Sequence, residues 1–385
     1  MNKTPSPFKT YARFKPISTK ENDICINSLI TSTQNSISID TQSFPFTKVF
    51  KSSQAEIFDA LLPSIIKDCI NGYNSSLITF GGAESGKSFT LMGPAYSLYD
   101  NESEYHGIIP RFIKYIYDDS KMTALINAAA VHIGVNFEAI EVDSNKVNDL
   151  LKELNVFNKK NSLYTKVELS NYQNAKNTLL QGFKNRNVSN KDATLIYAFT
   201  IDSVVTSKLT DKINSHQGKI MFVDLANSNS KSVGVLTNVM NMLIKKYKYI
   251  DFASNKLTSL LQPCICGDYK TNFISTISQS VINISDTLSV LDMNKKIGQL
   301  CNEVTQHENL KDALQLMVKE NSKIKDSMNK NKEEVSSSSN TNLFRSMTMN
   351  NIRKIDDKNT NDNSNKGNSN AINDNLKLLL SDLFI

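Results

Sequence analysis

The chain has 385 residues, of which 39% are hydrophobic, so it can bury one large core and still carry a polar tail. The net charge of +6 is modest: it suits an acidic partner surface and does not by itself indicate nucleic-acid binding. No apolar run approaches the length that spans a membrane, and the polar start, residues 1–7, does not resemble a signal peptide. We therefore expect a soluble intracellular protein without a nucleic-acid partner.

The five cysteines are odd in number and scattered, which is typical of reduced intracellular thiols; they are Cys25, Cys69, Cys264, Cys266 and Cys301. Cys264 and Cys266 have neither a second cysteine pair nor a nearby histidine. We therefore expect ordinary core or loop thiols here, not zinc ligands.

The N-terminal part of the chain predicts a strand, a polar region and a helix, in that order. Residues 8–16 alternate in polarity and predict a first strand that ends at Pro16. The polar stretch that continues to Ser43 predicts short hairpins or loops. Ser53 and Glu56 then form a capping box, which begins an amphipathic helix that ends at Gly72.

A phosphate-loop pattern follows this helix. The apolar residues 77–80 predict a buried strand, and Gly81, four further residues, Gly86, Lys87 and Ser88 complete the pattern. The glycines allow backbone N–H groups to point at an anion, Lys87 adds a positive charge, and Ser88 offers a hard oxygen to Mg²⁺. A helix that begins near Lys87 would add its positive dipole end. The alternative is a glycine turn without a ligand, but the strand before and the helix after favour nucleotide binding.

Two later apolar runs, residues 220–223 and 273–277, predict strands of a sheet that is covered on both faces. Because strands alternate with helical stretches along the chain, we expect an α/β layered architecture. Asp224 follows the first of these runs, where a carboxylate could hold Mg²⁺ through water. The alternative role for Asp224 is to cap a turn.

Several segments, in the same order as in the family, resemble the kinesin motor domain. They are residues 46–50, 72–74, 89–92, 107–111, 135–142, 148–151, 218–226, 255–262, 271–278 and 287–291. The resemblance extends from about Phe8 to Val304, so residues 1–304 are predicted to form the motor domain. It implies an α/β P-loop NTPase fold, with a mixed central sheet and helices on both faces.

The resemblance also implies ATP and Mg²⁺ as the bound nucleotide and metal. Lys87, Ser88 and Asp224 would be the catalytic residues, and Ser88 and Asp224 would hold the metal. Arg13 and Pro16 match residues that flank the adenine in the family, although Lys15 replaces a second arginine. The nucleotide would also contact the loop itself, through Gly81, Gly82, Ala83, Glu84, Ser85, Gly86, Lys87, Ser88 and Phe89.

The two switch motifs of the family are degenerate in this chain. Between retained flanks, residues 189–198 form a short switch I without the family's Ser-Ser-Arg. In switch II, Asn227 replaces the glycine whose N–H approaches the γ-phosphate, and Asn229 replaces the glutamate that pairs with the switch I arginine. Losing both partners of an ion pair is tolerable, whereas losing one would leave a lone charge. The pattern therefore predicts weakened hydrolysis.

Two further departures lie near the phosphates and after switch II. Glu84 stands where the family usually has glycine, and its carboxylate would repel phosphate unless it faces solvent or meets a cation. The interval between Asp224 and Asn255 is short, which predicts a trimmed loop and a short helix over residues 233–244.

Four lysines match the family's microtubule-facing loop and helix: Lys245, Lys246, Lys248 and Lys256. Because tubulin is acidic, the resemblance implies electrostatic docking on microtubules. The alternative is a solvated lysine patch without a partner.

The tail predicts three segments. In residues 305–333, apolar positions over 310–328 recur at spacings of three and four, which predicts a short helical neck or a weak coiled coil that could form a homodimer or heterodimer. A helix that packs on the core is an equal alternative. Residues 334–375 have a composition typical of disorder, and residues 376–385 are apolar again.

The sequence thus supports a kinesin-like microtubule-based motor that binds ATP–Mg²⁺ and hydrolyses it slowly, in the cytoplasm on the microtubule cytoskeleton. The alternative is a non-hydrolysing pseudo-kinesin that binds microtubules or a partner protein. An unrelated phosphate-loop NTPase would not explain the ordered downstream motifs.

Overall fold

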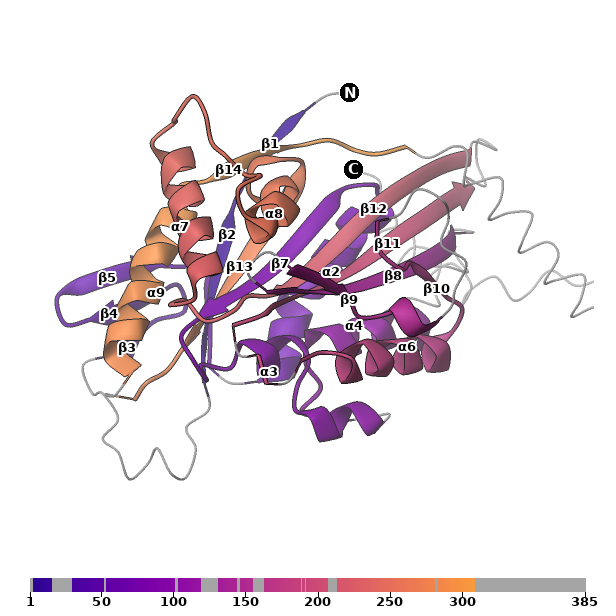
Figure 1. Ribbon diagram of the computed structural model, residues 1–385, viewed down its shortest axis with the longest axis horizontal. Helices are drawn as coiled ribbons and strands as arrows, with labels where there is room; N and C mark the ends of the chain where they lie inside the picture. The colour runs from indigo at the N-terminus through magenta and orange to yellow at the C-terminus, as the bar shows by residue number, and fades with distance from the viewer. Residues whose placement is uncertain are drawn as a thin grey trace, which may run out of the picture.

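The computed structural model describes residues 3–15, 30–51, 53–100, 103–118, 131–143, 146–154, 163–187, 189–190, 192–206, 213–280 and 283–308. Its centre is a nine-stranded sheet in the order β10-β8-β11-β12-β7-β13-β2-β6, with β9 paired to β8 (Figure 1). The strands are β2 (Lys9–Phe14), β6 (Lys48–Phe50), β7 (Asn74–Gly81), β8 (Val131–Asp143), β9 (Lys146–Asp149), β10 (Val167–Leu169), β11 (Thr194–Thr206), β12 (Ile213–Asp224) and β13 (Tyr269–Ile277).

The sheet is mixed, as the sequence predicts. β12, β7, β13, β2 and β6 run parallel to one another, whereas β8, β9, β10 and β11 join by antiparallel pairing. Parallel strands end at the same edge, and ligands of such sheets bind beyond those carboxyl ends. The register pairs Asp224 with Thr79, so the end of β12 lies beside the end of β7.

Helices cover both faces of the sheet (Figure 1). α2 (Gln54–Ile70), α4 (Ile108–Asp118) and α6 (Tyr172–Lys184) lie on one face. α7 (Lys231–Ile244), α8 (Lys256–Cys266) and α9 (Ile284–Ile297) lie on the other. Each layer buries its own apolar cluster against the sheet, so the predicted two-faced α/β architecture is confirmed. Three short helices, α3 (Lys87–Leu91), η1 (Ala95–Tyr99) and η2 (Lys152–Leu154), complete the described helical structure.

The N-terminal region contains two strands that the sequence did not predict, β6 in the central sheet and β1 outside it. β1 (Thr4–Pro7) precedes β2 and pairs antiparallel with β14 (Cys301–Val304), so two distant segments of the chain lie side by side. The predicted hairpins form a separate small sheet of β3 (Ile30–Ser32), β4 (Ser36–Ile39) and β5 (Gln42–Pro45). The Ser53 hydroxyl accepts a hydrogen bond from the Glu56 N–H at 3.2 Å, which caps α2 as the sequence pattern indicates.

Beyond Val304 the described chain still contacts the core. The His307 N–H donates to the Gly72 carbonyl at 2.9 Å, and its ring lies 2.6 Å from an oxygen of Asp268. The predicted coiled-coil residues 310–328, the polar stretch 334–375 and the apolar end 376–385 lie outside the described residues. In the described residues, no helix is long and apolar enough to cross a membrane.

Two of the cysteines are core residues. Cys69 and Cys264 are buried, and burial raises the pKa of Cys264 to about 12, so its thiol stays protonated at neutral pH. Cys266 and Cys301 are exposed, and Cys25 lies outside the described residues. Within the described ranges, no group of three or more histidine, cysteine or carboxylate side chains could hold a metal ion.

Candidate functional site

The phosphate loop connects the end of β7 to the start of α3. Gly86 precedes α3 with a φ of 101°, a left-handed conformation that favours glycine, and α3 begins at Lys87 as predicted. At Gly81 a Cβ would collide with the hydroxyl oxygens of Thr276 and Ser85. The loop can therefore keep this conformation only with glycine at these two positions.

Lys87 is buried and folds back onto the loop. Its Nζ donates to the carbonyls of Gly81 at 3.1 Å and Gly82 at 2.7 Å, and to Asn227 Oδ1 at 3.3 Å. Burial lowers the pKa of Lys87, and the charges of Asp224 and Asp286 partly oppose that shift. A bound phosphate would supply the anionic partner that the buried ammonium group favours.

Two oxygen-bearing side chains meet next to Lys87. The Ser88 hydroxyl donates to Asp224 Oδ2 at 2.5 Å, and the Thr79 hydroxyl donates to Asp224 Oδ1 at 3.3 Å. Burial raises the pKa of Asp224, while these hydrogen bonds and the Lys87 charge oppose the rise. A hydroxyl and a carboxylate at this distance fit the hard-oxygen chemistry of Mg²⁺, which usually takes one or two protein oxygens and fills its shell with water and phosphate.

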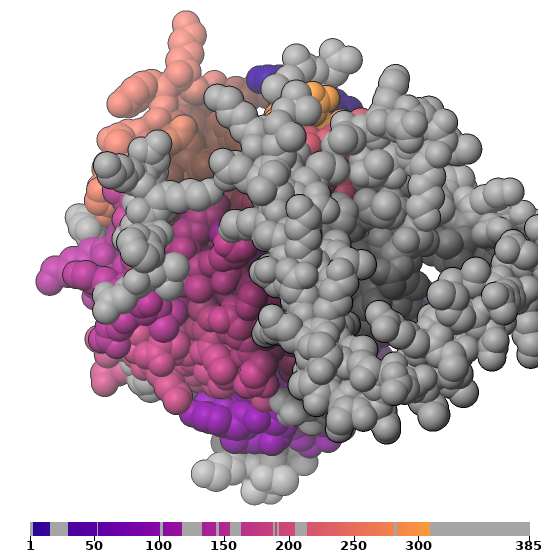
Figure 2. Space-filling view, turned by 90° about the vertical axis from the view of Figure 1, so that its right-hand side faces the viewer, coloured from indigo at the N-terminus to yellow at the C-terminus, as the bar shows by residue number. Residues whose placement is uncertain are grey.

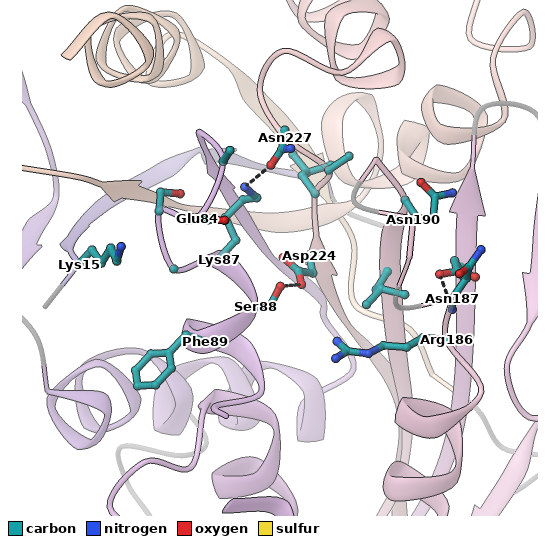
Figure 3. A pocket seen from close by; sticks show the side chains of 18 of the residues that line it. Lys15, Glu84, Lys87, Ser88, Phe89, Arg186, Asn187, Asn190, Asp224 and Asn227 are labelled. Carbon is teal, nitrogen blue, oxygen red and sulfur yellow. Dashed lines mark hydrogen bonds between the residues drawn. The ribbon is translucent and has the colours of Figure 1, made fainter. Parts of the chain in front are cut away.

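A cavity of about 690 Å³ separates the phosphate loop from the segment that follows α6 (Figure 3). This volume lies within the range of about 300–1,000 Å³ that is typical of small-molecule sites. The lining residues come from five elements and the loops between them: Arg13, Lys15, Ala83, Glu84, Ser85, Gly86, Lys87, Ser88, Phe89, Glu141, Arg186, Asn187, Asn190, Ala193, Leu195, Asp224, Leu225, Ala226 and Asn227. The structure thus brings most of the predicted nucleotide-binding residues to one cavity.

One end of the cavity contains Arg13, Lys15 and Phe89. Arg13 is 2% exposed; its Nη1 donates to the Thr90 hydroxyl at 2.6 Å, and its guanidinium lies over the Phe89 ring at 5.1 Å. Burial lowers the pKa of Arg13 to about 10, so the group stays charged at neutral pH. Pro16, the other predicted adenine contact, lies outside the described residues.

Glu84 occupies an unusual backbone conformation at the mouth of the loop. Its side chain is exposed, and its φ of 54° lies in the left-handed region that favours glycine. The exposure meets the condition under which a carboxylate is tolerated beside phosphates, because solvent screens its charge.

The two switch II asparagines have partners that the sequence does not reveal. Asn227 accepts from Lys87, and Asn229 Nδ2 donates to Asp286 Oδ1 at 3.2 Å. Asp286 belongs to α9 and lies so close to the loop that a Cβ on Gly82 would be 3.0 Å from its Oδ2. A carboxylate of α9 therefore borders the phosphate loop and holds the switch II segment.

The helix after switch II ends at Ile244 as predicted but begins two residues earlier. The expected start was Val233; α7 starts at Lys231, because the Ser230 hydroxyl caps it by accepting from the Val233 N–H at 3.3 Å. Only residues 225–230 separate β12 from α7.

Sequence reasoning missed one wall of the cavity. Arg186 and Asn187 lie just before switch I, Asn190 lies within it and Glu141 lies in β8; the sequence pattern marks none of them as a cavity residue. Glu141 is 3% exposed, accepts from the Asn187 N–H at 3.1 Å and from Asn148 Nδ2 at 3.3 Å. β8 also contains Asn136, Glu138 and Asp143, so no local sequence signal singles out Glu141 as part of this wall.

The predicted microtubule lysines gather at one end of the molecule. Lys245, Lys246 and Lys248 lie in the α7–α8 loop, Lys256 is the first residue of α8, and all four are exposed. Figure 2 shows the salmon-coloured α7–α8 region projecting at the top of the molecule. The only described acidic residue between them is Asp251, whose carboxylate accepts from the N–H groups of Ala253 and Ser254 within the loop.

Comparisons with known proteins agree on one family. The family described as Kinesin motor domain matches residues 13–300. The Kinesin heavy chain of Neurospora crassa is 25% identical over 352 residues, which cover 81% of this chain and 37% of the relative. Kinesin-like protein KIN-1 of Arabidopsis thaliana is 28% identical over 330 residues, which cover 73% of this chain and 68% of the relative. The chain thus spans less than two fifths of the Neurospora relative's length.

A solved structure described as that of a fast kinesin has the same fold. Its TM-score is 0.66 at 24% identity, and the match covers 79% of this chain and 95% of that one. At this identity the likeness concerns the fold and not the chemistry of individual residues.

Proposed function

This chain belongs to the kinesin motor family, and from that membership we propose that it binds ATP–Mg²⁺ at the phosphate loop and docks on microtubules. The observation that carries the proposal is the contact of Ser88 with Asp224 at 2.5 Å, next to the buried Lys87, in a nucleotide-sized cavity. The family match covers residues 13–300, which include all three side chains.

The three side chains would divide the work between phosphate and metal. Ser88 and Asp224 would hold Mg²⁺, directly or through water, and the metal would neutralise charge on the outer phosphates. Lys87 would exchange its carbonyl partners for phosphate oxygens, which form stronger charge-assisted hydrogen bonds. Arg13, Lys15 and Phe89 would border the base at the far end of the cavity.

We further propose that hydrolysis is slow. Asn227 Oδ1 accepts a hydrogen bond from the Lys87 ammonium group. Asn229 donates to Asp286, whereas the family's glutamate at this position pairs with a switch I arginine. Phosphoryl transfer depends on preorganised donors and a positioned water around the terminal phosphate. The second candidate function, a non-hydrolysing module that binds microtubules or a partner, is favoured by these same two contacts.

Docking on microtubules would use the exposed lysines of the α7–α8 loop and α8. Four lysines against one aspartate make this end of the molecule basic, and tubulin offers an acidic surface. Association through residues 310–328 and residence in the cytoplasm on microtubules complete the proposal, and both rest on the family and the sequence pattern.

The binding proposal is tested by titrating a fluorescent ATP analogue with and without Mg²⁺. Lys87→Ala removes the charge, and Ser88→Ala removes the hydroxyl that the metal would use. We expect Lys87→Ala to abolish measurable binding, and Ser88→Ala to remove the enhancement that Mg²⁺ gives the wild type. Lys184→Ala, a nearby lysine outside the cavity, is the matched control. Equal affinity of wild type and Lys87→Ala would refute the proposed site.

A further inference from the structure

We propose that Arg186 is the ligand of the terminal phosphate and makes the site prefer a nucleoside triphosphate over a diphosphate. This inference rests on the proposed nucleotide site and adds a residue that neither the phosphate-loop pattern nor the predicted site includes. Three features of Arg186 carry it: a fixed position, a buried donor without a described acceptor, and a location across the cavity from Lys87 and Ser88.

The position of Arg186 is fixed by the end of α6. Asn185 caps the helix, donates from Nδ2 to the Leu150 carbonyl at 2.8 Å and accepts from Gln181 Nε2 at 3.1 Å. The Arg186 guanidinium then stacks on the Phe183 ring, with 3.7 Å between its central carbon and the ring centroid. A side chain held by stacking loses little further freedom when it binds a ligand.

The guanidinium retains unused hydrogen-bonding capacity. Its Nε is buried and donates to no described acceptor, and the salt bridges among the described residues do not include Arg186. Buried donors in folded proteins are almost always paired, so this guanidinium is poorly satisfied by the described protein groups. Because Arg186 lines the cavity, a ligand there can supply a partner to the accessible part of the guanidinium. That partner must be an acceptor, since arginine carries no acceptor of its own.

The direction of the side chain identifies where the acceptor lies. Figure 3 shows the Arg186 guanidinium extending from the wall after α6 toward Ser88 and Phe89, with Asp224 beside it. The cation therefore faces the position where Ser88 and Asp224 would hold Mg²⁺ and the outer phosphates.

The chemistry of this wall fits a phosphate better than a neutral ligand. A planar guanidinium offers paired N–H donors that match two phosphate oxygens. Backbone N–H groups of the loop would hold the inner phosphates, and Lys87 would reach the outer ones. A third phosphate would extend farther from the loop, toward the wall that contains Arg186. A diphosphate lacks this group, so it would gain nothing from Arg186.

The test compares fluorescent analogues of ATP and ADP, each titrated with Mg²⁺ into wild type, Arg186→Gln, Arg186→Lys and the control Lys184→Gln. Lys184 lies two residues away, over the Tyr99 ring and outside the cavity. We expect Arg186→Gln to weaken ATP binding by about tenfold or more and to leave ADP binding within about twofold, as loss of a charge-assisted contact predicts. Arg186→Lys keeps the charge and should recover part of the ATP affinity, and Lys184→Gln should change neither.

If Arg186 had only a structural role, its replacement would loosen the wall and weaken the binding of both nucleotides equally. If Arg186→Gln loses equal affinity for ATP and ADP, or loses affinity for neither, the inference about Arg186 is overturned. The proposed function still stands in that case, provided that the wild type binds the ATP analogue. Absence of binding by the wild type, under conditions where a relative's motor domain binds, overturns both. Thermal unfolding of each variant checks that the fold persists. If Arg186→Gln unfolds, Arg186→Lys serves as the test variant, because it keeps the charge and changes only the guanidinium geometry.

Discussion

The two sides of the cavity differ in how completely they are built for phosphate chemistry. On one side, the loop, α3 and the end of β12 place Lys87, Ser88 and Asp224 within hydrogen-bonding distance of their neighbours. On the other side, the segments that would sense the terminal phosphate carry asparagines, and these bind Lys87 and Asp286. The first side suits tight binding of a metal–phosphate group. The second side lacks the family's switch I Ser-Ser-Arg and switch II glycine, and Arg186 is the donor that we propose there for the terminal phosphate.

The difference indicates that binding and hydrolysis can diverge within one site. Binding depends on backbone geometry and on residues adjacent in sequence, which a single short loop provides. Hydrolysis depends on residues from separate segments that act as a unit, so the loss of several need not cost more than the loss of one. The predictions below test this division, from the largest expected effect to the smallest.

The largest effect concerns turnover. We expect steady-state phosphate release in excess microtubules to be about 10²–10³ slower than that of an ordinary kinesin motor domain, because removal of one transition-state donor typically costs this much. The motor domain of the Drosophila melanogaster Kinesin heavy chain, a relative that is 26% identical over 340 residues, is a suitable comparison in the same assay. Nucleotide affinity should remain close to that of the comparison protein, because the loop side is intact.

The matched variant is Asn227→Gly, which frees the Lys87 ammonium group and restores the glycine of the family motif. We expect it to raise phosphate release only in part, since Asn229 and the switch I segment stay unchanged. Strong stimulation of the wild type to ordinary motor turnover would show that the chain builds its switches from other residues.

The comparison also explains what the sequence could predict. The loop was predictable because its pattern is local: glycine spacing sets the backbone, and the strand before and helix after set the direction. The position of Asp224 followed from the alternation of strands and helices, which makes parallel neighbours end at one edge. The mixed sheet and its two helical layers came from the family resemblance together with apolar runs of strand length.

The switch II contacts and the wall that contains Arg186 could not be predicted because both depend on tertiary contacts. The contact of Asn229 with Asp286 joins residues 57 positions apart, and nothing in either local pattern indicates it. The inward direction of Arg186 depends on how Asn185 ends α6 and on the Phe183 ring beneath the guanidinium. The pairing of β1 with β14 likewise joins the two ends of the described chain, so neither strand is evident from its own residues.

A smaller effect is expected at the lysine end of the molecule. Charge reversal at Lys245, Lys246 and Lys248 should weaken co-sedimentation with microtubules by roughly tenfold, since exposed charge pairs contribute about 0.2–1 kcal/mol each. Rising ionic strength should weaken the wild type in the same direction because salt screens exposed charges. Binding of the fluorescent ATP analogue should not change, which would show that microtubule docking and nucleotide binding depend on different residues.

Reversal of three other exposed lysines, Lys146, Lys152 and Lys184, is the control for net charge. It makes the same change in total charge but lies outside the α7–α8 loop and α8. Co-sedimentation that responds equally to both triple variants would mean that overall charge, and not this loop, governs docking.

The smallest effect concerns Glu84, the one residue of the loop side that departs from its pattern. A non-glycine residue with a φ of 54° costs about 1 kcal/mol, and an exposed carboxylate beside phosphates adds a weak repulsion. Glu84→Gly should therefore tighten ATP binding by roughly two- to fivefold, with little change in the free energy of unfolding, because glycine gains about as much unfolded-state entropy as it relieves in strain.

Glu84→Gln removes the charge but keeps the side chain, so it separates the two causes: tightening by both variants would indicate repulsion, and tightening by Glu84→Gly alone would indicate backbone strain. Titration of the ATP analogue at low and high salt measures both, since only the repulsion should fade as salt rises. If Glu84→Gly instead weakened ATP binding, the exposed carboxylate would contribute favourably at the mouth of the loop. The phosphate loop would then differ from that of its family in how it binds ATP.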